Sequence, residues 1–190
     1  MLEPLKGEKR ALVAVEPVTG DVRASVRRAL EGAEWRRVVP RGADVALKVN
    51  LGWDLFIPGS ITSPLVAEAL ILEIREHVDS IYMVEADQVL EDVESAFYRS
   101  GMAAVCQRTG VKWVNMERTP SVTVARPDNL ILRDVRIPQI LCDTVLISVP
   151  VMKTHAKTVI TGALKNQWGC LNKMRHEYHL VIDDALSDLN

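Results

Sequence analysis

The sequence lacks any patterned set of cysteines. Its three cysteines, Cys106, Cys142 and Cys170, are odd in number and widely spaced, so they indicate neither a disulfide framework nor a CxxC metal motif. A CxxCxxC run, which could ligate an iron–sulfur cluster, is absent as well. We therefore expect a protein of the reducing cytoplasm with no iron–sulfur ligand motif of its own, and the sequence leaves any other cofactor open.

Long apolar runs and strong net charge are also missing. No apolar run approaches the roughly 18 residues that span a bilayer, and no N-terminal stretch has the charged and apolar regions of a signal peptide. The formal net charge is −2, with a pI near 6.1, and no basic helix face stands out. We expect the protein to bind neither nucleic acid nor a membrane.

The usual fingerprints of nucleotide and hydrolase sites do not occur. The sequence contains no GxGxxG, no GxxxxGK[ST] and no GxSxG, so a phosphate-binding glycine loop and a serine nucleophile elbow are both excluded. None of the cysteines has a recognisable nucleophile context, although Cys170 follows closely on a polar cluster described below.

The sequence does contain apolar runs that alternate with amphipathic stretches. With 48% hydrophobic and 25% charged residues in 190, it is typical of a single globular domain, here residues 1–190. Apolar runs predict strands at 11–16, 44–49, 80–85, 111–115 and 144–149, and periodic stretches predict helices at 21–32, 64–77, 91–100, 102–109, 158–168 and 179–189. We expect an α/β fold with a mostly parallel sheet, helices on both faces, and a short antiparallel excursion near 121–136.

Polar residues gather where several of these strands end. Asn50 and Gly52 follow one strand, Glu85 and Asp87 end another, and Lys153, Thr154 and His155 follow a third. Because open α/β sheets bind ligands at the carboxyl ends of their strands, these residues predict a ligand site at one sheet edge. Each residue taken alone also fits a solvated strand end.

A helix over 158–168 would place more cationic and polar groups at the same edge. Lys157, Thr161 and Lys165 are spaced four residues apart, with Asn166 beside them, so on a helix they would form one polar stripe. Near a helix N-terminus such groups favour an anion, so a phosphate or carboxylate ligand is the hypothesis. An ordinary solvated helix face is the other interpretation.

Histidine and lysine residues supply candidates for proton transfer and metal binding. His155 could act as an acid or base near neutral pH, or ligate a metal through its neutral imidazole. Burial could lower the pKa of Lys153 or Lys165 enough to make a lysine a base. Thr62 or Ser63, before Pro64, could start a helix, and Thr62 is also a candidate ligand contact. His176 and His179 are spaced three residues apart, and Asp183 follows four residues after His179. On one helix face this spacing makes a metal site geometrically possible.

Three blocks of the sequence resemble a known prokaryotic family. These are KVNLG (48–52), TSPLVAEAL (62–70) and, above all, PVMKTHAKTVITGALKNQWGCL (150–171), followed by Lys173 and His179. The chain is similar in these blocks to domain-of-unknown-function family 362, whose members are often described as iron–sulfur proteins. The resemblance implies a domain incomplete at its C-terminus, because family members extend beyond the region that corresponds to Leu189.

Two functions from different classes follow from these observations. In the first, an enzyme binds a small anionic metabolite or phosphorylated cofactor in a cleft lined by lysine, histidine and asparagine. In the second, implied by the family resemblance, the polar cluster is a docking surface for an iron–sulfur or redox partner protein. A third interpretation is structural, with the cluster satisfying buried polar groups. The sequence does not determine the oligomeric state, and an oligomer is compatible with it.

Overall fold

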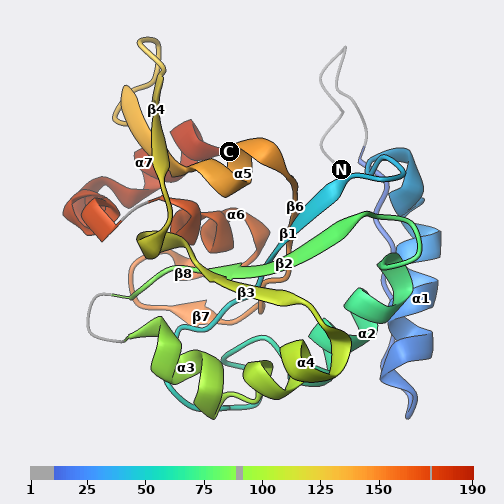
Figure 1. Ribbon diagram of the computed structural model, residues 1–190. Helices are drawn as coiled ribbons and strands as arrows, with labels where there is room; N and C mark the ends of the chain where they lie inside the picture. Colours follow the sequence, from blue (N-terminus) through green and yellow to red (C-terminus); the bar gives the residue numbers. More distant parts are fainter. Residues whose placement is uncertain (1–10, 89–91, 172) are drawn as a thin grey trace, which may run out of the picture.

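A central parallel sheet organises the molecule. The computed structural model describes residues 11–88, 92–171 and 173–190. Within them, four parallel strands lie in the order β3-β2-β1-β6 (Figure 1). Their bounds are β1 Asp44–Lys48, β2 Ser80–Glu85, β3 Lys112–Asn115 and β6 Val145–Ser148. The predicted α/β fold with a mostly parallel sheet is confirmed.

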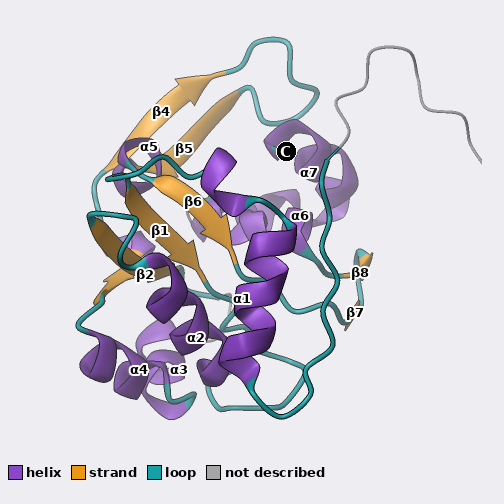
Figure 2. Cartoon of the chain, turned by 90° about the vertical axis from the view of Figure 1, so that its right-hand side faces the viewer, coloured by secondary structure: helices purple, strands orange, loops and turns teal. Residues whose placement is uncertain are grey.

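One face of this sheet carries the main hydrophobic core. It is covered by α1 Val22–Gly32, α2 Pro64–Ile74, α3 Val93–Arg99 and α4 Met102–Thr109, with the short 3-10 helix η1 Trp35–Arg37 beside α1. Figure 2 shows α1 and α2 lying across the strands. Val45 and Leu47 of β1 and Ile71 of α2 are fully buried in this core. The alternate residues of β1 therefore point towards these helices.

The opposite face is covered by the connection between β3 and β6. This connection contains η2 Met116–Arg118, the antiparallel pair β4 Ser121–Ala125 and β5 Asp134–Pro138, and α5 Gln139–Asp143. Ala46 and Val84 of the sheet pack with Met116 and partly buried Ile140 there. Helices thus lie on both faces, and the antiparallel excursion predicted near 121–136 is confirmed.

The C-terminal region packs around a smaller core of its own. It comprises β7 Thr154–His155, β8 Val159–Ile160, α6 Ala163–Asn166, the 3-10 helices η3 Gln167–Cys170 and η4 Lys173–Val181, and α7 Ile182–Leu189. Trp168 and Ile182 are buried with Leu132 and Val135 from the β4–β5 region. This contact joins the end of the chain to the antiparallel excursion.

The strand order reverses direction between β1 and β6. From β1 the chain adds β2 and β3 on one side, and it then returns to place β6 on the other side of β1. The loops that leave the carboxyl ends of β1 and β6 consequently diverge. In open α/β sheets such a reversal point is the usual position of a ligand crevice.

The prediction of a first strand at 11–16 is wrong. These residues are extended coil with exposed side chains, Val13 being 75% and Val15 87% exposed. The segment runs beside α1, where the Ser25 hydroxyl donates to the Pro17 carbonyl at 3.0 Å. A strand needs a neighbouring backbone to bond with, and an apolar sequence alone does not supply one.

The prediction of a helix over 158–168 is also wrong. Residues 154–160 form the β7–β8 hairpin, and only Ala163–Asn166 is α-helical before a 3-10 turn. The Thr161 hydroxyl donates to the Val151 carbonyl at 2.7 Å, which closes the hairpin instead of facing out from a helix. The predicted stripe of Lys157, Thr161 and Lys165 therefore does not exist.

The remaining elements differ mainly at their ends. The helix predicted for 64–77 ends at Ile74, and the one predicted for 179–189 begins at Ile182, after a stretch of 3-10 helix. The helix predicted for 91–100 is α3, capped by Asp92, and the start of that prediction at residue 91 lies outside the described residues. Within the described ranges, no helix is both long and apolar enough to cross a bilayer.

Candidate functional site

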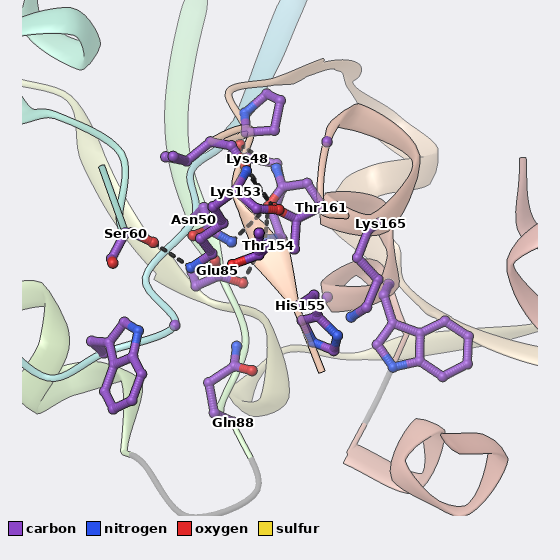
Figure 3. Close-up of a pocket in the computed structure, with 18 of the residues that line it drawn as sticks. Lys48, Asn50, Ser60, Glu85, Gln88, Lys153, Thr154, His155, Thr161 and Lys165 are labelled. Carbon is purple, nitrogen blue, oxygen red and sulfur yellow. Dashed lines mark hydrogen bonds and ion pairs between the residues drawn. The ribbon is translucent and has the colours of Figure 1, made fainter. Parts of the chain in front are cut away.

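A cavity of about 460 Å³ opens at the reversal point between β1 and β6. Its walls come from the ends of β1 and β2, the loop after β1, the β7–β8 hairpin and the α6–η3 region, and Figure 3 shows these side chains converging. Among the described residues, four cationic side chains line it, namely Lys48, Lys153, Lys165 and Arg175, together with His155 and one carboxylate, Glu85. The cavity is therefore rich in hydrogen-bond donors and positive charge.

A buried ion pair forms the floor of the cavity. Lys48 Nζ lies 2.6 Å from Glu85 Oε1, and both side chains are almost completely buried. The same carboxylate accepts backbone N–H bonds from Leu51 at 3.1 Å and Ala86 at 2.9 Å. The pair thus joins the ends of two neighbouring strands with its charges matched.

Asn166 connects this floor to β6. Its side-chain amide donates to the Lys48 carbonyl at 3.2 Å and to the Ser148 hydroxyl at 3.0 Å. Its Oδ1 accepts longer bonds from Lys48 Nζ and Asn50 Nδ2, each at 3.4 Å. One buried amide therefore fixes the relative position of β1, β6 and α6.

Thr62 holds the two diverging loops together from behind the cavity. Its hydroxyl donates to the Val149 carbonyl at 2.7 Å and accepts from the Asn50 backbone N–H at 2.8 Å. Of the two residues predicted to start the helix at Pro64, Ser63 is the N-cap of α2. Thr62, also predicted to contact the ligand, does not line the cavity. Its role is to set the spacing of the loops.

Lys153 and Lys165 differ from Lys48 in having no carboxylate partner among the described residues. The Lys153 ammonium donates to the Ser60 carbonyl, and burial lowers the pKa of Lys153. Lys165 Nζ lies 5.9 Å from the centroid of the Trp168 ring. Burial, followed by the charges of Arg175 and Lys48, lowers the pKa of Lys165 to about 8.

His155 occupies the β7 end of the cavity. Its Nδ1 accepts backbone N–H bonds from Lys157 at 3.1 Å and Thr158 at 3.3 Å, within its own hairpin turn. Burial lowers the pKa of His155, and the neighbouring charges of Lys165, His179 and Lys153 lower it further. In Figure 3 the Lys165 side chain extends towards the His155 ring.

Arg175 closes the cavity from the C-terminal region. The residue is 2% exposed. Its guanidinium donates to Glu117 Oε1 and to the Leu171 carbonyl at 3.0 Å each, and also to the Asp87 carbonyl. Asp87, predicted to bind ligand, does not line the cavity. Its carboxylate instead accepts from Val93 N–H at 3.2 Å, next to the N-terminus of α3.

The structure brings most of the site residues predicted from the sequence to this one cavity. Those that line it are Asn50, Gly52, Glu85, Lys153, Thr154, His155, Thr161, Lys165 and Asn166. Sequence reasoning missed others, namely Lys48, Trp53, Ser60, Gln88, Trp168 and Arg175. Lys48 could have been found, because an isolated lysine inside an apolar strand requires a buried partner. Nothing in the sequence pattern signals Arg175.

The predicted metal pair lies outside the cavity. The rings of His176 and His179 are stacked with centroids 5.1 Å apart, and His179 Nδ1 lies 3.0 Å from the His176 carbonyl. The helix that would align them with Asp183 begins only at Ile182. In the described ranges no group of three or more His, Cys, Asp or Glu side chains could hold a metal, so this site stays a sequence prediction.

Comparison with known proteins agrees with the blocks recognised in the sequence. The chain finds no match among curated proteins or among solved structures. Residues 45–190 match the family model described as a domain of unknown function, DUF362. This range includes all of the parallel sheet except Asp44, together with every described residue that lines the cavity. Since the match covers most of its length, the chain belongs to the DUF362 family.

Proposed function

We propose that the protein is an enzyme that binds a small carboxylate or phosphate in this cavity and moves a proton with a lysine side chain. The observation that carries the proposal is the pair of ammonium groups, Lys153 and Lys165, at the reversal point of the sheet. Both are partly buried, and no carboxylate of the described residues pairs with either.

The charge balance of the cavity supports an anionic ligand. Glu85 neutralises Lys48, and Glu117 neutralises Arg175. Lys153 and Lys165 remain as two desolvated cations, whose burial is unfavourable without a counter-charge. An anion bound between them would supply this charge and form charge-assisted hydrogen bonds.

Two residues of the cavity wall carry buried polar atoms that lack a partner among the described residues. Asn50 Oδ1 and Trp168 Nε1 find no hydrogen-bond partner within the described part of the chain. Buried polar groups are nearly always satisfied in folded proteins, so each marks a position for a ligand atom or a water molecule. The Trp168 indole N–H can only donate and thus suits an acceptor oxygen of an anion, whereas Asn50 Oδ1 can only accept and suits a donor such as water.

Lys165 is the residue best suited to accept a proton. Because its pKa is about 8, Lys165 is a neutral amine in an appreciable fraction of the protein molecules near neutral pH. General bases work best when their pKa lies close to the working pH. Binding of an anion would raise the pKa of Lys165, so a substrate that loses its proton to this amine would leave a stabilised ion pair.

Ligand-induced thermal stabilisation tests the proposal. We expect inorganic phosphate or pyruvate to raise the melting temperature of the wild-type protein. Lys153→Met and Lys165→Met should weaken binding about tenfold or more, as expected for lost charged hydrogen bonds. Lys157→Met is the matched control, because Lys157 is exposed in the hairpin turn and does not line the cavity. Equal responses from all three variants would place the anion site elsewhere.

A second candidate function is docking of a cysteine-rich iron–sulfur or redox partner. The observation that favours it is a group of exposed apolar side chains on and beside the β7–β8 hairpin, Met152 at 78%, Val159 at 81% and Leu164 at 63% exposure. Such exposed groups can mark a protein interface. Purification from the native host tests this candidate. Recovery of no cysteine-rich partner would count against it.

A further inference from the structure

The hairpin that carries His155 fixes which of its nitrogens holds the proton. Nδ1 accepts two backbone N–H bonds, from Lys157 and Thr158. A ring nitrogen that accepts hydrogen bonds cannot carry a hydrogen of its own. In the neutral ring the proton must therefore lie on Nε2. The backbone of the hairpin fixes this tautomer, so no ligand is needed to select it.

The charged form of the ring is disfavoured for a reason of geometry. Protonation of Nδ1 would direct an N–H group at the N–H groups of Lys157 and Thr158, so two hydrogen bonds would become repulsive contacts. The cationic groups Lys153 and Lys165 and the imidazole of His179 act on the ring from the other elements around it. Within the described part of the chain, all the charged groups that shift the pKa of His155 are basic and lower it, so they disfavour an imidazolium.

We propose that His155 serves as a fixed, neutral hydrogen-bond donor, which presents Nε2–H to an unprotonated oxygen of the bound anion. This inference rests on the proposed function and narrows it. The sequence alone allowed His155 to act as acid, base or metal ligand, whereas a locked Nε2–H tautomer cannot accept a proton at either nitrogen. Lys165 is then the proton acceptor of the pair, and His155 polarises or orients the ligand.

This arrangement also narrows the ligand class. His155 and the two ammonium groups of the cavity all donate, and Trp168 Nε1 adds another donor to the wall. The ligand therefore presents several acceptor oxygens close together, as in a carboxylate with a neighbouring carbonyl or in a phosphate. A cation or an uncharged apolar molecule has nothing to offer these donors.

Nitrogen-15 NMR of the ring nitrogens in the ligand-free protein tests the tautomer directly. The chain contains four histidines, and two others provide internal references. His179 Nδ1 lies 3.0 Å from a carbonyl, so it must donate and report the Nδ1–H form. His77 Nε2 lies 2.9 Å from the Val39 carbonyl and reports the Nε2–H form. We expect His155 to resemble His77 at pH 7, and a signal like that of His179, or an imidazolium signal, would overturn the inference.

Two substitutions separate the donor role from the structural role of the ring. His155→Asn keeps an acceptor near the Nδ1 position for the hairpin but leaves no donor at the Nε2 position, whereas His155→Gln places an amide N–H near the Nε2 position. With inorganic phosphate as the probe, we expect His155→Asn to weaken binding about tenfold or more and His155→Gln to restore most of the loss. Equal losses in both would refute the donor role.

The outcomes also distinguish this inference from the proposed function. If neither phosphate nor pyruvate binds the wild-type protein, the anion site is refuted and the ligand contact of His155 is refuted with it. If phosphate binds and depends on Lys165 but leaves the Nε2–H signal of His155 unshifted, the proposed function stands and the donor role fails. A shift of that signal on binding supports both.

Discussion

Gly169 lies directly against the buried ammonium of Lys48. A Cβ at position 169 would come within 2.9 Å of both Nζ and Cε of Lys48 and within 3.0 Å of Glu85 Oε1. Carbon atoms do not approach so closely without displacement. The glycine therefore provides the space in which the ion pair on the floor of the cavity is assembled.

Gly169→Ala should destabilise the protein by about 1–3 kcal/mol, the usual cost of overpacking a buried site. Gly162→Ala is the control, because a Cβ there meets no atom within 4 Å and its φ of −179° is open to any residue. The measurement is urea unfolding of both variants. Equal stability would mean that the Lys48 side chain moves aside at no cost.

The Lys48–Glu85 pair should show strong coupling in a double-mutant cycle. Lys48→Met alone leaves a buried carboxylate without its cation, and we expect a loss of about 3–5 kcal/mol. Glu85→Gln alone leaves the ammonium without its counter-charge. The double variant should lose less than the sum of the two single losses. Additive losses in denaturant unfolding would show that the two groups do not stabilise each other.

Lys165 should make the stability of the protein rise with pH. Its pKa is about 8 in the folded protein against 10.5 for an ordinary lysine, so between these values the unfolded chain binds more protons. The free energy of unfolding then increases from pH 8 to 10.5, by at most about 3 kcal/mol. Below pH 8 the full penalty of the buried charge is present.

Comparison with Lys165→Met isolates this effect from other alkaline titrations. The variant should be more stable than the wild type at pH 7, and the difference should shrink as pH rises through 10. Thermal or urea unfolding at several pH values measures it. A difference that does not vary with pH would mean that Lys165 has an ordinary pKa.

Asn166→Asp should weaken the junction of β1 and β6 by about 1–3 kcal/mol, because the Lys48 carbonyl and the Ser148 hydroxyl lose their donor. Asn190→Asp is the control, since the Asn190 amide makes its hydrogen bonds at an exposed position, and it should change stability by no more than about 0.5 kcal/mol. Urea unfolding at neutral pH compares the two. An Asn166 effect as small as the Asn190 effect would contradict the bridging role.

The central strands were predictable because burial on both faces demands continuous apolar runs. Residues 44–49 and 80–85 have this pattern, and they contain β1, which ends at Lys48, and β2. Residues 11–16 have it too, yet lie exposed, because strand formation depends on a partner backbone that a local pattern does not specify. The helix predicted at 158–168 failed for a related reason, since the hairpin is held by contacts of Thr161 with Val151 and Lys153.

The candidate site was predictable as far as it follows strand ends. Asn50, Glu85 and His155 lie near the carboxyl ends of strands, where the fold class places a ligand. The partners of these residues were not predictable, because they come from distant positions. Asn166 contacts Lys48 across 118 residues of sequence, and Arg175 contacts Asp87 across 88. Only the folded chain brings such pairs together.

The hydrogen bonds of Arg175 to Asp87 and Glu117 determine when the cavity can form during synthesis of the chain. During synthesis, β1 and β2 emerge first, and at about 5–20 residues per second the chain reaches position 175 on the order of ten seconds later. Until then the floor ion pair has no Gly169 beside it and no closing arginine. The proposed anion site would thus be completed only after residue 175 has been made, and an anion bound there would preferentially stabilise chains in which Arg175 is in place.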